Sequence, residues 1–279
     1  MRDPDAATAA RLAGAAIFAQ DDVAASYHAR QPYAPEAYAA LLAEVPGRAR
    51  ALDLGCGPGP VARELAPHFG EVVALDPSAP MIAAARQAGG PANVRWVCAR
   101  AEDFGERAPF DLVVAGSSIH WVDPAIVFPK LARLTGLFAH LANDPTFPRP
   151  PPPCGIEAWL AFLERWNPRV GRQTPAAWRD PPAPPPPHAV HEAWIDVAGR
   201  RRFAFGFRQS VADFIASCHA RVSWPRQMMG AELAAAFDAD LTALLIPHAE
   251  GDGRLALTVV TDLVWGAPRT AMKTGRSGS

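Results

Sequence analysis

The feature that most constrains the fold of this chain is the segment 51–60, which reads A-L-D-L-G-C-G-P-G-P. A short apolar run carries Asp53 near its end, and glycines follow at every second position from Gly55 to Gly59. Glycine is needed where the backbone turns sharply between a strand and a helix, and where a ligand approaches the backbone closely. The segment therefore predicts a strand–loop–helix unit that binds a ligand beyond the carboxyl end of the strand.

The acid before the loop restricts the kind of ligand. A dinucleotide-binding loop would read G-x-G-x-x-G, whereas here Pro60 stands at the position of the third glycine. The Asp53 carboxylate would repel a pyrophosphate and would suit a ligand that carries a cationic amine. The loop therefore disfavours an NAD-type oxidoreductase and favours a cofactor with an amino-acid-like end.

A second acid, Asp76, ends the next strand-like run, V-V-A-L-D-P-S. It lies about 20 residues beyond the loop, where an acid can accept hydrogen bonds from ribose hydroxyls. The alternative is a helix N-cap or turn residue before Pro77. Because the acid coincides with the loop and with the right strand, we favour the ribose-binding role.

Strand-like and helix-like segments alternate over residues 47–142, which predicts a parallel sheet covered on both faces. Strands are expected at 50–54, 71–76, 94–99, 110–116 and 137–142, and helices at 60–69, 79–88 and 126–134. Further along, helices are expected at 156–166, 211–220 and 231–246, and strands at 202–207 and 254–264. The proline tracts 145–153 and 181–187 can form neither regular helix nor central strand, so they predict extended spacers.

These patterns predict five regions along the chain. They are an N-terminal helical segment or lid (1–46), a ligand-binding core (47–142), a proline-rich and helical cap that includes the sixth strand (143–253), the last strand (254–268) and a disordered tail (269–279). The tail is small and basic, as mobile chain ends often are.

Four motifs together resemble the class I methyltransferases that depend on S-adenosylmethionine (SAM). They are D-L-G-C-G-P-G from Asp53, A-L-D-P-S-x-x-M from Ala74, A-R-A-E-D-F from Ala99 and F-D-L-V-V-A from Phe110. The resemblance covers residues 24–142, a little under half of the chain. It implies a Rossmann-like, doubly wound, mostly parallel seven-stranded α/β sheet, with a helical cap inserted before the last two strands, and SAM as the cofactor.

Two flanking segments are similar to the trans-aconitate methyltransferase-like branch. Residues 27–35 read Y-H-A-R-Q-P-Y-A-P and resemble Y-x-x-x-R-P-x-Y-P, although Gln31 follows Arg30 where that pattern has proline. Residues 117–123 read S-S-I-H-W-V-D and resemble A-x-x-x-H-W-F-D more closely. The resemblance does not carry a substrate with it.

The resemblance also implies which residues hold the cofactor. Asp53 and the loop glycines line the methionine end of SAM, Asp76 holds the ribose, Met81 packs near the adenosine, and Ala101–Glu102 contacts the adenine edge. The expected cofactor-binding set is Tyr27, Arg30, Asp53, Gly55, Cys56, Gly57, Asp76, Pro77, Met81, Ala101, Glu102 and Ser117. For Cys56 a small buried side chain is favoured over a reactive nucleophile.

Methyl transfer from a sulfonium needs mainly proximity and alignment, although a hydroxyl or amine acceptor can also need a base. His120 is the candidate base, because it follows a strand at the carboxyl edge of the sheet. The alternative is that His120 orients a loop or packs with Trp121. His219 and Arg221 could bind an acidic acceptor, and for them packing is favoured.

The segment 144–253 is rich in aromatic residues, which predicts an apolar acceptor pocket. The pocket residues expected are His120, Trp121, Trp159 and His219. The alternative for each aromatic residue is an ordinary helical core.

Charge and composition exclude several classes of protein. A net charge of -1 gives no global attraction for a polyanion, so a nucleic-acid partner is not expected. The four cysteines form no C-x-x-C pair and have no histidine at zinc-ligand spacing, so neither a metal site nor a disulfide framework is expected. There is no run of 18 apolar residues, which argues against a membrane span. The chain is expected in the cytoplasm.

The sequence thus predicts methyl transfer from SAM to a small-molecule acceptor, at a hydroxyl or carboxylate oxygen, by a monomer or homodimer. The Ala-, Pro- and Arg-rich composition suggests bacterial secondary metabolism. The sequence A-G-S-S after the fourth strand disfavours methylation of nucleobase amino groups. A SAM-binding protein of the same fold that is a non-methylating catalyst or a binding module remains the alternative.

Overall fold

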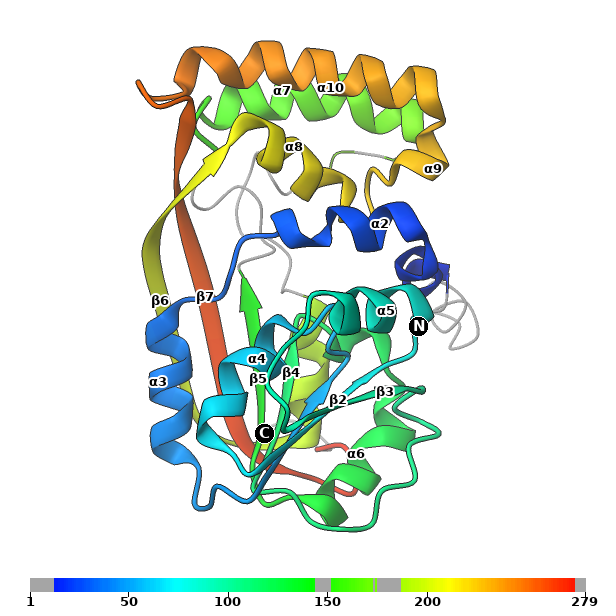
Figure 1. The fold of residues 1–279 in the computed structure, drawn as a ribbon, viewed down its shortest axis with the longest axis vertical. Coiled ribbons are helices and arrows are strands. Elements are labelled where there is room, and N and C mark those ends of the chain that lie inside the picture. Colours follow the sequence, from blue (N-terminus) through cyan, green and yellow to red (C-terminus); the bar gives the residue numbers. More distant parts are fainter. Residues whose placement is uncertain (1–12, 144–151, 173, 175–186, 274–279) are drawn as a thin grey trace, which may run out of the picture. The chain divides into compact units, whose positions relative to one another are not determined.

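The computed structural model describes residues 13–143, 152–172, 174 and 187–273 (Figure 1). Its contacts divide the chain into two compact units. The sheet unit comprises Pro35–Ala142, Pro187–Phe203 and Thr261–Ser279. The helical unit comprises Met1–Ala34, Asn143–Pro186 and Ala204–Val260. Each unit is therefore assembled from three separate stretches of the sequence.

Seven strands form one sheet in the order β3-β2-β1-β4-β5-β7-β6. They are β1 (Arg50–Leu54), β2 (Glu71–Asp76), β3 (Val94–Cys98), β4 (Leu112–Gly116), β5 (Phe138–Asn143), β6 (Ile195–Ser210) and β7 (Arg254–Pro268). The first five strands pair in parallel, and Asp53 of β1 lies opposite Ala74 of β2 and Val114 of β4. The strand order reverses between β1 and β4, and open α/β sheets bind their ligands at such a point.

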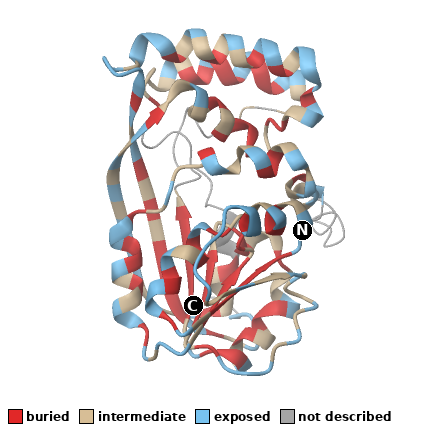
Figure 2. Ribbon diagram, in the orientation of Figure 1, coloured by how far each residue is buried: buried red, intermediate tan, exposed pale blue. Residues whose placement is uncertain are grey.

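The sheet unit is built on these central strands. Its helices are α3 (Pro35–Glu44), α4 (Pro60–Leu65) with η3 (Ala66–His68), α5 (Ala79–Gln87), η4 (Ile119–Trp121), α6 (Pro124–Leu134) and η7 (Pro187–Trp194). Side chains cap two of them: the Ser78 hydroxyl accepts from Met81 N, and the Asp123 carboxylate accepts from Ala125 N. Figure 2 shows buried residues concentrated along the central strands, as expected for strands covered on both faces.

The helical unit packs around aromatic side chains. Its helices are η1 (Ile17–Ala19), α2 (Asp21–Ser26), η2 (Tyr27–Ala29), α7 (Ile156–Trp166), η5 (Asn167–Val170), α8 (Val211–His219), α9 (Arg226–Met229), α10 (Ala231–Leu245) and η8 (Ile246–His248). Phe237 of α10 lies edge-on to both Phe162 and Trp166 of α7, with ring centroids 5.3 Å apart in each pair. The helical spacing of the aromatic residues in 156–166 therefore serves a packed interior.

The predicted fold class is confirmed, and most elements lie where the sequence placed them. The strands β1 and β2 and the helix α7 match their predicted bounds. The sixth strand is much longer than the predicted 202–207. Gly199 of β6 lies against the ring of Trp265 of β7, where a side chain would clash, so the two strands approach closely. The run of charged residues from Arg200 interrupts the apolar pattern, so the sequence did not indicate a strand in this part of the chain.

The first residues of the predicted disordered tail, 269–273, are hydrogen-bonded to the rest of the sheet unit. The backbone N–H of Arg269 donates to Trp194 O, and that of Lys273 donates to Ala193 O, each at 2.8 Å. The side chains of both residues also pair with Asp196, at 2.6 and 3.3 Å. These bonds hold residues 269–273 within the sheet unit, and residues 274–279 lie outside the described part.

The two compact units divide the chain at positions other than the predicted region boundaries. Helix α3 belongs to the sheet unit, whereas the expected N-terminal segment ran to residue 46. Strands β6 and β7 each contribute residues to both units. Most of the two proline tracts, and Trp178, fall outside the described residues. Within the described ranges, no helix is long and apolar enough to cross a membrane.

Candidate cofactor site

The glycine loop turns back onto the end of β2. Gly55, Gly57 and Gly59 all have positive φ, at 72°, 54° and 88°, in the left-handed region that side chains disfavour. The backbone N–H groups of Gly55 and Cys56 both donate to Leu75 O, at 2.7 and 2.9 Å. The three glycines therefore meet a real conformational need, as the sequence predicted.

Ser118, at the N-cap of η4 just beyond β4, contacts the glycine loop. A Cβ atom on Gly55 would lie 2.5 Å from the Cβ of Ser118, so no larger residue fits there. The Ser118 hydroxyl donates to Leu54 O, at the end of β1. Ser117 beside it has φ 52°, which makes it the only described residue other than glycine with positive φ. The sequence reasoning named Ser117 and missed Ser118, whose partners come from a different strand.

Arg63 supports the far side of the loop. Its guanidinium lies 5.2 Å from the centre of the Trp96 ring and donates to Pro58 O at 2.5 Å and Ala85 O at 2.7 Å. A side chain on Gly59 would overlap the same Trp96 ring. Arg63 therefore ties the loop to α5, a role that nothing in the glycine motif signals.

Asp53 is the most unusual group in the site. Its side chain is fully buried, and neither carboxylate oxygen makes a hydrogen bond of ordinary distance and angle with any residue that the structure describes. Burial raises the pKa of Asp53 to about 8, the backbone N–H of Ala62 lowers it, and the nearby Asp76 raises it further. The contact with Ala62 N–H falls outside the geometric limits of a hydrogen bond and does not offset the cost of burial. A buried carboxyl group in this state points to a ligand group as its partner.

Asp76 closes the opposite side of the loop. Its Oδ2 accepts from Gly57 N and its Oδ1 accepts from Ser78 N, each at 2.8 Å. Burial raises the pKa of this carboxyl group as well. Each carboxylate oxygen can accept a second hydrogen bond, so the turn-forming role and the ribose-binding role are compatible.

The A-R-A-E-D-F segment is joined to the start of α6. The Glu102 Oε1 accepts from Asp123 N at 2.8 Å, and Lys130 Nζ donates to Glu102 O. The Glu102 carboxylate thus positions the backbone at the N-terminus of α6. Ala101 is the residue immediately before Glu102. A contact between this pair and the adenine edge stays a prediction.

The remaining residues of the sheet unit lie near the ends of β2 and β4. Met81 is buried in the first turn of α5, which begins directly after Asp76, Pro77 and Ser78. In η4, the rings of His120 and Trp121 are 4.5 Å apart and tilted by 50°. The Cys56 thiol is buried and donates to Gly57 O at 3.4 Å, and burial raises its pKa well above the usual range. This environment favours the packing role for Cys56.

Four predicted site residues belong to the helical unit. Arg30 lies 5.3 Å from the ring centre of Tyr27, and both follow α2. Trp159 is 4% exposed and stacks on Phe162 at 5.4 Å. The sheet unit and the helical unit thus divide the predicted set between them.

His219 is 1% exposed and makes two short hydrogen bonds, to Trp224 O and to the Asp238 carboxylate, each at 2.6 Å. Both of its ring nitrogens are therefore occupied inside the unit. This geometry favours the packing alternative for His219, as burial does for Trp159, and leaves their pocket role a proposal.

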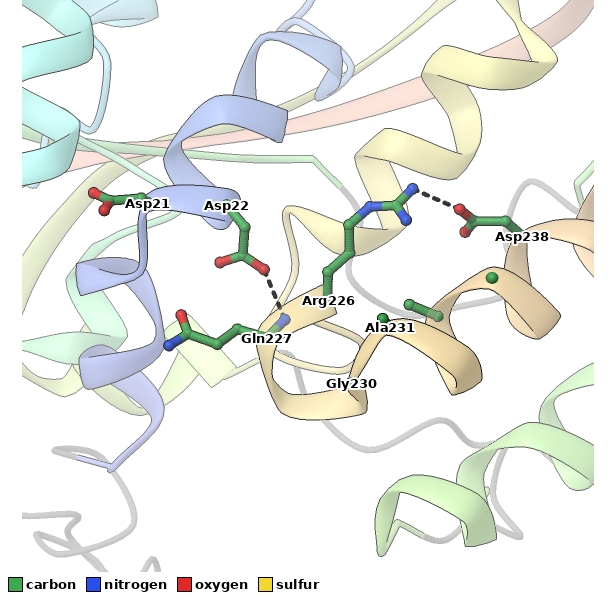
Figure 3. Close-up of a pocket in the computed structure, with 9 residues that line it drawn as sticks. Asp21, Asp22, Arg226, Gln227, Gly230, Ala231 and Asp238 are labelled. Carbon is green, nitrogen blue, oxygen red and sulfur yellow. Dashed lines mark hydrogen bonds and ion pairs between the residues drawn. The ribbon is translucent and has the colours of Figure 1, made fainter.

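A hollow of about 620 Å³ lies on the helical unit, between α2, α9 and α10 (Figure 3). Three of its polar side chains are engaged: the Asp22 carboxylate accepts from Gln227 N at 2.9 Å, and Arg226 pairs with Asp238 at 2.6 Å. None of the predicted site residues lines it. The hollow is therefore a poor candidate for the cofactor site.

Comparisons with known proteins agree with the geometry. A family model described as a methyltransferase domain matches residues 51–136. An uncharacterized methyltransferase of Mycobacterium bovis is 32% identical over 187 residues, covering 61% of this chain and 90% of that protein. A trans-aconitate 2-methyltransferase of Streptomyces avermitilis is 36% identical over 95 residues, covering 30% of this chain and 35% of that enzyme. For that enzyme and two other curated methyltransferases, the match spans only 33–35% of the relative's length.

A solved structure shows the same fold over nearly the whole chain. It is that of a protein from Anaeromyxobacter dehalogenans assigned to the type II methyltransferases, with a TM-score of 0.56 and 23% identity, covering 88% of this chain and 99% of that one. Together with the glycine loop and its two buried acids, the mycobacterial match decides the family. The chain belongs to the class I SAM-dependent methyltransferases. The motifs predicted this family, and SAM is its cofactor.

Proposed function

We propose that this protein transfers the methyl group of SAM to an oxygen atom of a small-molecule acceptor, either a hydroxyl or a carboxylate. The observation that carries the proposal is the buried Asp53 carboxylate at the glycine loop, whose oxygens make no hydrogen bond of ordinary geometry to the described part of the chain. A cationic amine such as the one on the amino-acid end of SAM would supply the missing partner.

The chain's own residues would bind and orient the cofactor. Asp53 and the backbone of Gly55 and Gly57 would hold the methionine end, and the free acceptor sites of Asp76 would receive the ribose hydroxyls. Met81, with Ala101 and Glu102, would bound the adenosine. When bound, SAM supplies an electrophilic sulfonium methyl, so that alignment of the acceptor is the main task left to the protein.

His120 is proposed as the base for a hydroxyl acceptor, whereas a carboxylate acceptor needs none. In the first case, replacing His120 by alanine lowers kcat by about 10²–10⁴-fold, because the hydroxyl proton loses its acceptor. In the second case kcat is nearly unchanged. The exposed His68 of the same unit provides the matched control, as His68→Ala. Trp121 is proposed to bound the acceptor beside His120.

We further propose that the protein works in the cytoplasm as a monomer or homodimer, without a nucleic-acid partner, in bacterial secondary metabolism. The near-neutral charge and the Ala-, Pro- and Arg-rich composition support this proposal.

Calorimetric titration with SAM and separately with NAD(H) tests the cofactor, in the wild type, Asp53→Asn and Asp76→Ala. We expect micromolar SAM binding that both variants weaken at least about 10-fold, because each removes a group that receives the ligand. Asp262→Ala, which removes a surface ion pair with Arg202, is the control and keeps the affinity. Binding of NAD(H) in place of SAM would overturn the proposal.

Turnover is tested separately with radiolabelled SAM and a library of hydroxyl and carboxylate compounds. Transfer of label to any of them supports the proposed function. Tight SAM binding without any transfer would favour the non-methylating alternative.

A further inference from the structure

Arg30 and Arg221 lie next to each other in the helical unit, where η2 packs against α8. They are linked crosswise. Arg30 Nη1 donates to Ala220 O at 3.3 Å, and Arg221 Nη2 donates to Gln31 Oε1 at 3.0 Å. Each guanidinium thus contacts the residue that adjoins the other arginine, although the two are far apart in the sequence.

The two positive charges have no carboxylate partner among the described residues. Other arginines of the same unit do have one: Arg226 pairs with Asp238 at 2.6 Å, and Arg208 pairs with Asp252 at 2.8 Å. Arginine stays charged in proteins, so the repulsion between the two groups cannot be relieved by losing a proton. Burial and the charge of Arg30 both lower the pKa of Arg221. The pair is therefore electrostatically costly as it stands.

A buried amide network holds Arg221 in this position. Gln31 Nε2 donates to Gln209 Oε1 at 2.8 Å, and Gln209 Nε2 donates to Ala29 O at 2.6 Å. Gln209 is buried, and Ser217 accepts a longer bond from Gln31. These bonds orient the carbonyl oxygen of Gln31 toward Arg221 and keep the guanidinium from moving away. The protein thus holds a second cation beside Arg30 at some cost.

The helix terminus explains only part of this arrangement. Helix α8 ends at His219, and the partial negative charge at a helix C-terminus stabilises a nearby cation. That effect accounts for one arginine but not for two adjacent ones. It also disfavours a dianion such as phosphate more than a singly charged carboxylate. The remaining N–H donors of the pair are of the kind that recognise planar oxyanions.

We propose that Arg30 and Arg221 together bind a carboxylate group of an acidic acceptor. This inference rests on the proposed methyl transfer and narrows its substrate class to carboxylic acids. The cofactor also carries a carboxylate, and Arg30 is among the residues predicted to contact the cofactor. The experiment must therefore separate the two sources.

Chemical protection tests the pair in the wild-type protein. Phenylglyoxal modifies arginine side chains, and peptide mass spectrometry reports the rate at each one. With S-adenosylhomocysteine saturating, benzoate or succinate is expected to slow modification of Arg30 and Arg221 at least about 5-fold at constant ionic strength, as occupied donors react poorly. Benzamide, which is neutral, leaves both rates unchanged, and Arg208 serves as the internal reference.

The cofactor arm compares S-adenosylhomocysteine with 5′-methylthioadenosine, which lacks the amino-acid carboxylate. If only the former protects the pair, and benzoate or succinate then adds nothing, the carboxylate is that of the cofactor and the acceptor assignment is overturned. If no carboxylate protects the pair under either condition, or inorganic phosphate protects it and carboxylates do not, the proposal is also overturned.

Variants give an independent measurement by calorimetry. Arg221→Gln is expected to weaken binding of the protective carboxylate about 10-fold or more, Arg221→Lys to retain part of it, and Arg208→Gln to change nothing. SAM affinity of Arg221→Gln is expected to stay within about 2-fold of wild type, because Arg221 is not among the predicted cofactor contacts and Arg30 is unchanged in this variant. Should Arg221→Gln fail to fold, Arg221→Lys and the protection data still decide. If the wild-type protein does not bind SAM but carboxylates still protect Arg30 and Arg221, the proposed function is refuted and the carboxylate site is still supported.

Discussion

The glycine loop of the sheet unit and the aromatic interior of the helical unit both carry residues that sequence reasoning assigned to a binding site. The structure treats their polar groups differently. At the loop, the Asp53 carboxylate is buried and neither oxygen makes a hydrogen bond of ordinary geometry to a described residue. In the helical unit, His219 is equally buried but both ring nitrogens have partners 2.6 Å away. Burial alone therefore does not identify a site. An ionisable carboxyl group that is buried without such a bond is the stronger indication, because burying it costs more than burying a neutral donor such as the Trp224 indole N–H.

The same contrast separates strain from packing. The loop holds three glycines at positive φ. Ser117, after β4, is the one described residue other than glycine that has a positive φ. The helical unit stacks Trp159, Phe162 and Trp166 at the separations of an ordinary aromatic core. Residues at the loop hold a costly arrangement that a ligand can use, and those in the aromatic interior contribute to stability.

Replacing Trp159 by alanine is expected to have the largest effect on stability, and it tests whether this residue only packs the interior of the helical unit. We expect a loss of about 3–5 kcal/mol in the free energy of unfolding, because a large buried ring leaves a cavity. Denaturant unfolding measures it, and SAM affinity at low denaturant is expected to be unchanged. Ile246→Ala, at an exposed apolar position of the same unit, is the control. A stable Trp159→Ala variant with altered acceptor affinity would instead make Trp159 a pocket residue.

Gly55→Ala tests the strain at the loop. We expect a loss of roughly 2–4 kcal/mol, because alanine disfavours φ 72° and its Cβ would overlap Ser118. Gly105→Ala in the same unit meets no atom within 4 Å and should change stability little. Thermal and denaturant unfolding of the two variants give the comparison. Equal stability of both would mean that the loop adapts and that its geometry is not demanding.

Asp53→Asn tests the burial of the Asp53 carboxyl group through the pH dependence of folding stability. The folded protein holds the Asp53 proton up to a pKa of about 8, whereas the unfolded chain releases it near 3.8. The wild type therefore loses stability as pH rises from about 4 to 8, and the contribution is complete only below the lower value. The variant lacks this slope, and we expect it to be about 1–3 kcal/mol more stable at pH 8 while it binds SAM more weakly.

Unfolding curves at pH 5, 6, 7 and 8 would measure that slope, with Asp262→Asn as the control for a surface carboxylate. SAM affinity in the wild type should also rise over this range, since the cationic ligand favours ionised Asp53. Parallel pH profiles for wild type and Asp53→Asn would show that Asp53 has a partner in solution, and the contrast between the two regions would fail.

Ser118→Ala has the smallest expected effect. Its hydroxyl bond to Leu54 O is lost, and we expect a decrease of about 0.5–1.5 kcal/mol in stability. SAM affinity should fall by less than about 10-fold, because the loop loses one tether and keeps its glycines. Chemical denaturation and calorimetry test this, with Asp103→Ala, at an exposed position of the same unit, as the control. A larger effect on affinity than on stability would place Ser118 in contact with the cofactor.

The sequence predicted the central strands and the glycine loop because both depend on local patterns. Val72 to Leu75 read as a buried strand, and the glycines indicate a turn that side chains disfavour. By contrast, Ser118 and Arg63 act on residues brought near by the sheet and by α5, and no spacing along the chain reveals that. Strand β6 was underestimated because the charged run from Arg200 obscured an alternating burial pattern.

The Arg30–Arg221 pair shows the same limit at its extreme. Sequence reasoning treated the two residues separately, one as a cofactor contact and one as a packing residue. Their link to each other's neighbours joins positions 190 residues apart. Only the fold places two uncompensated charges together.

The division of the helical unit into three stretches has a consequence for biosynthesis. Residues of β1 to β5 emerge from the ribosome in nearly continuous order, so their sheet can begin to form while the rest is being made. The segment that holds Arg30 emerges earlier but must wait for Ala220 and its neighbours, 190 residues later. During translation that segment therefore lacks its final partners until residue 220 and its neighbours have been synthesised.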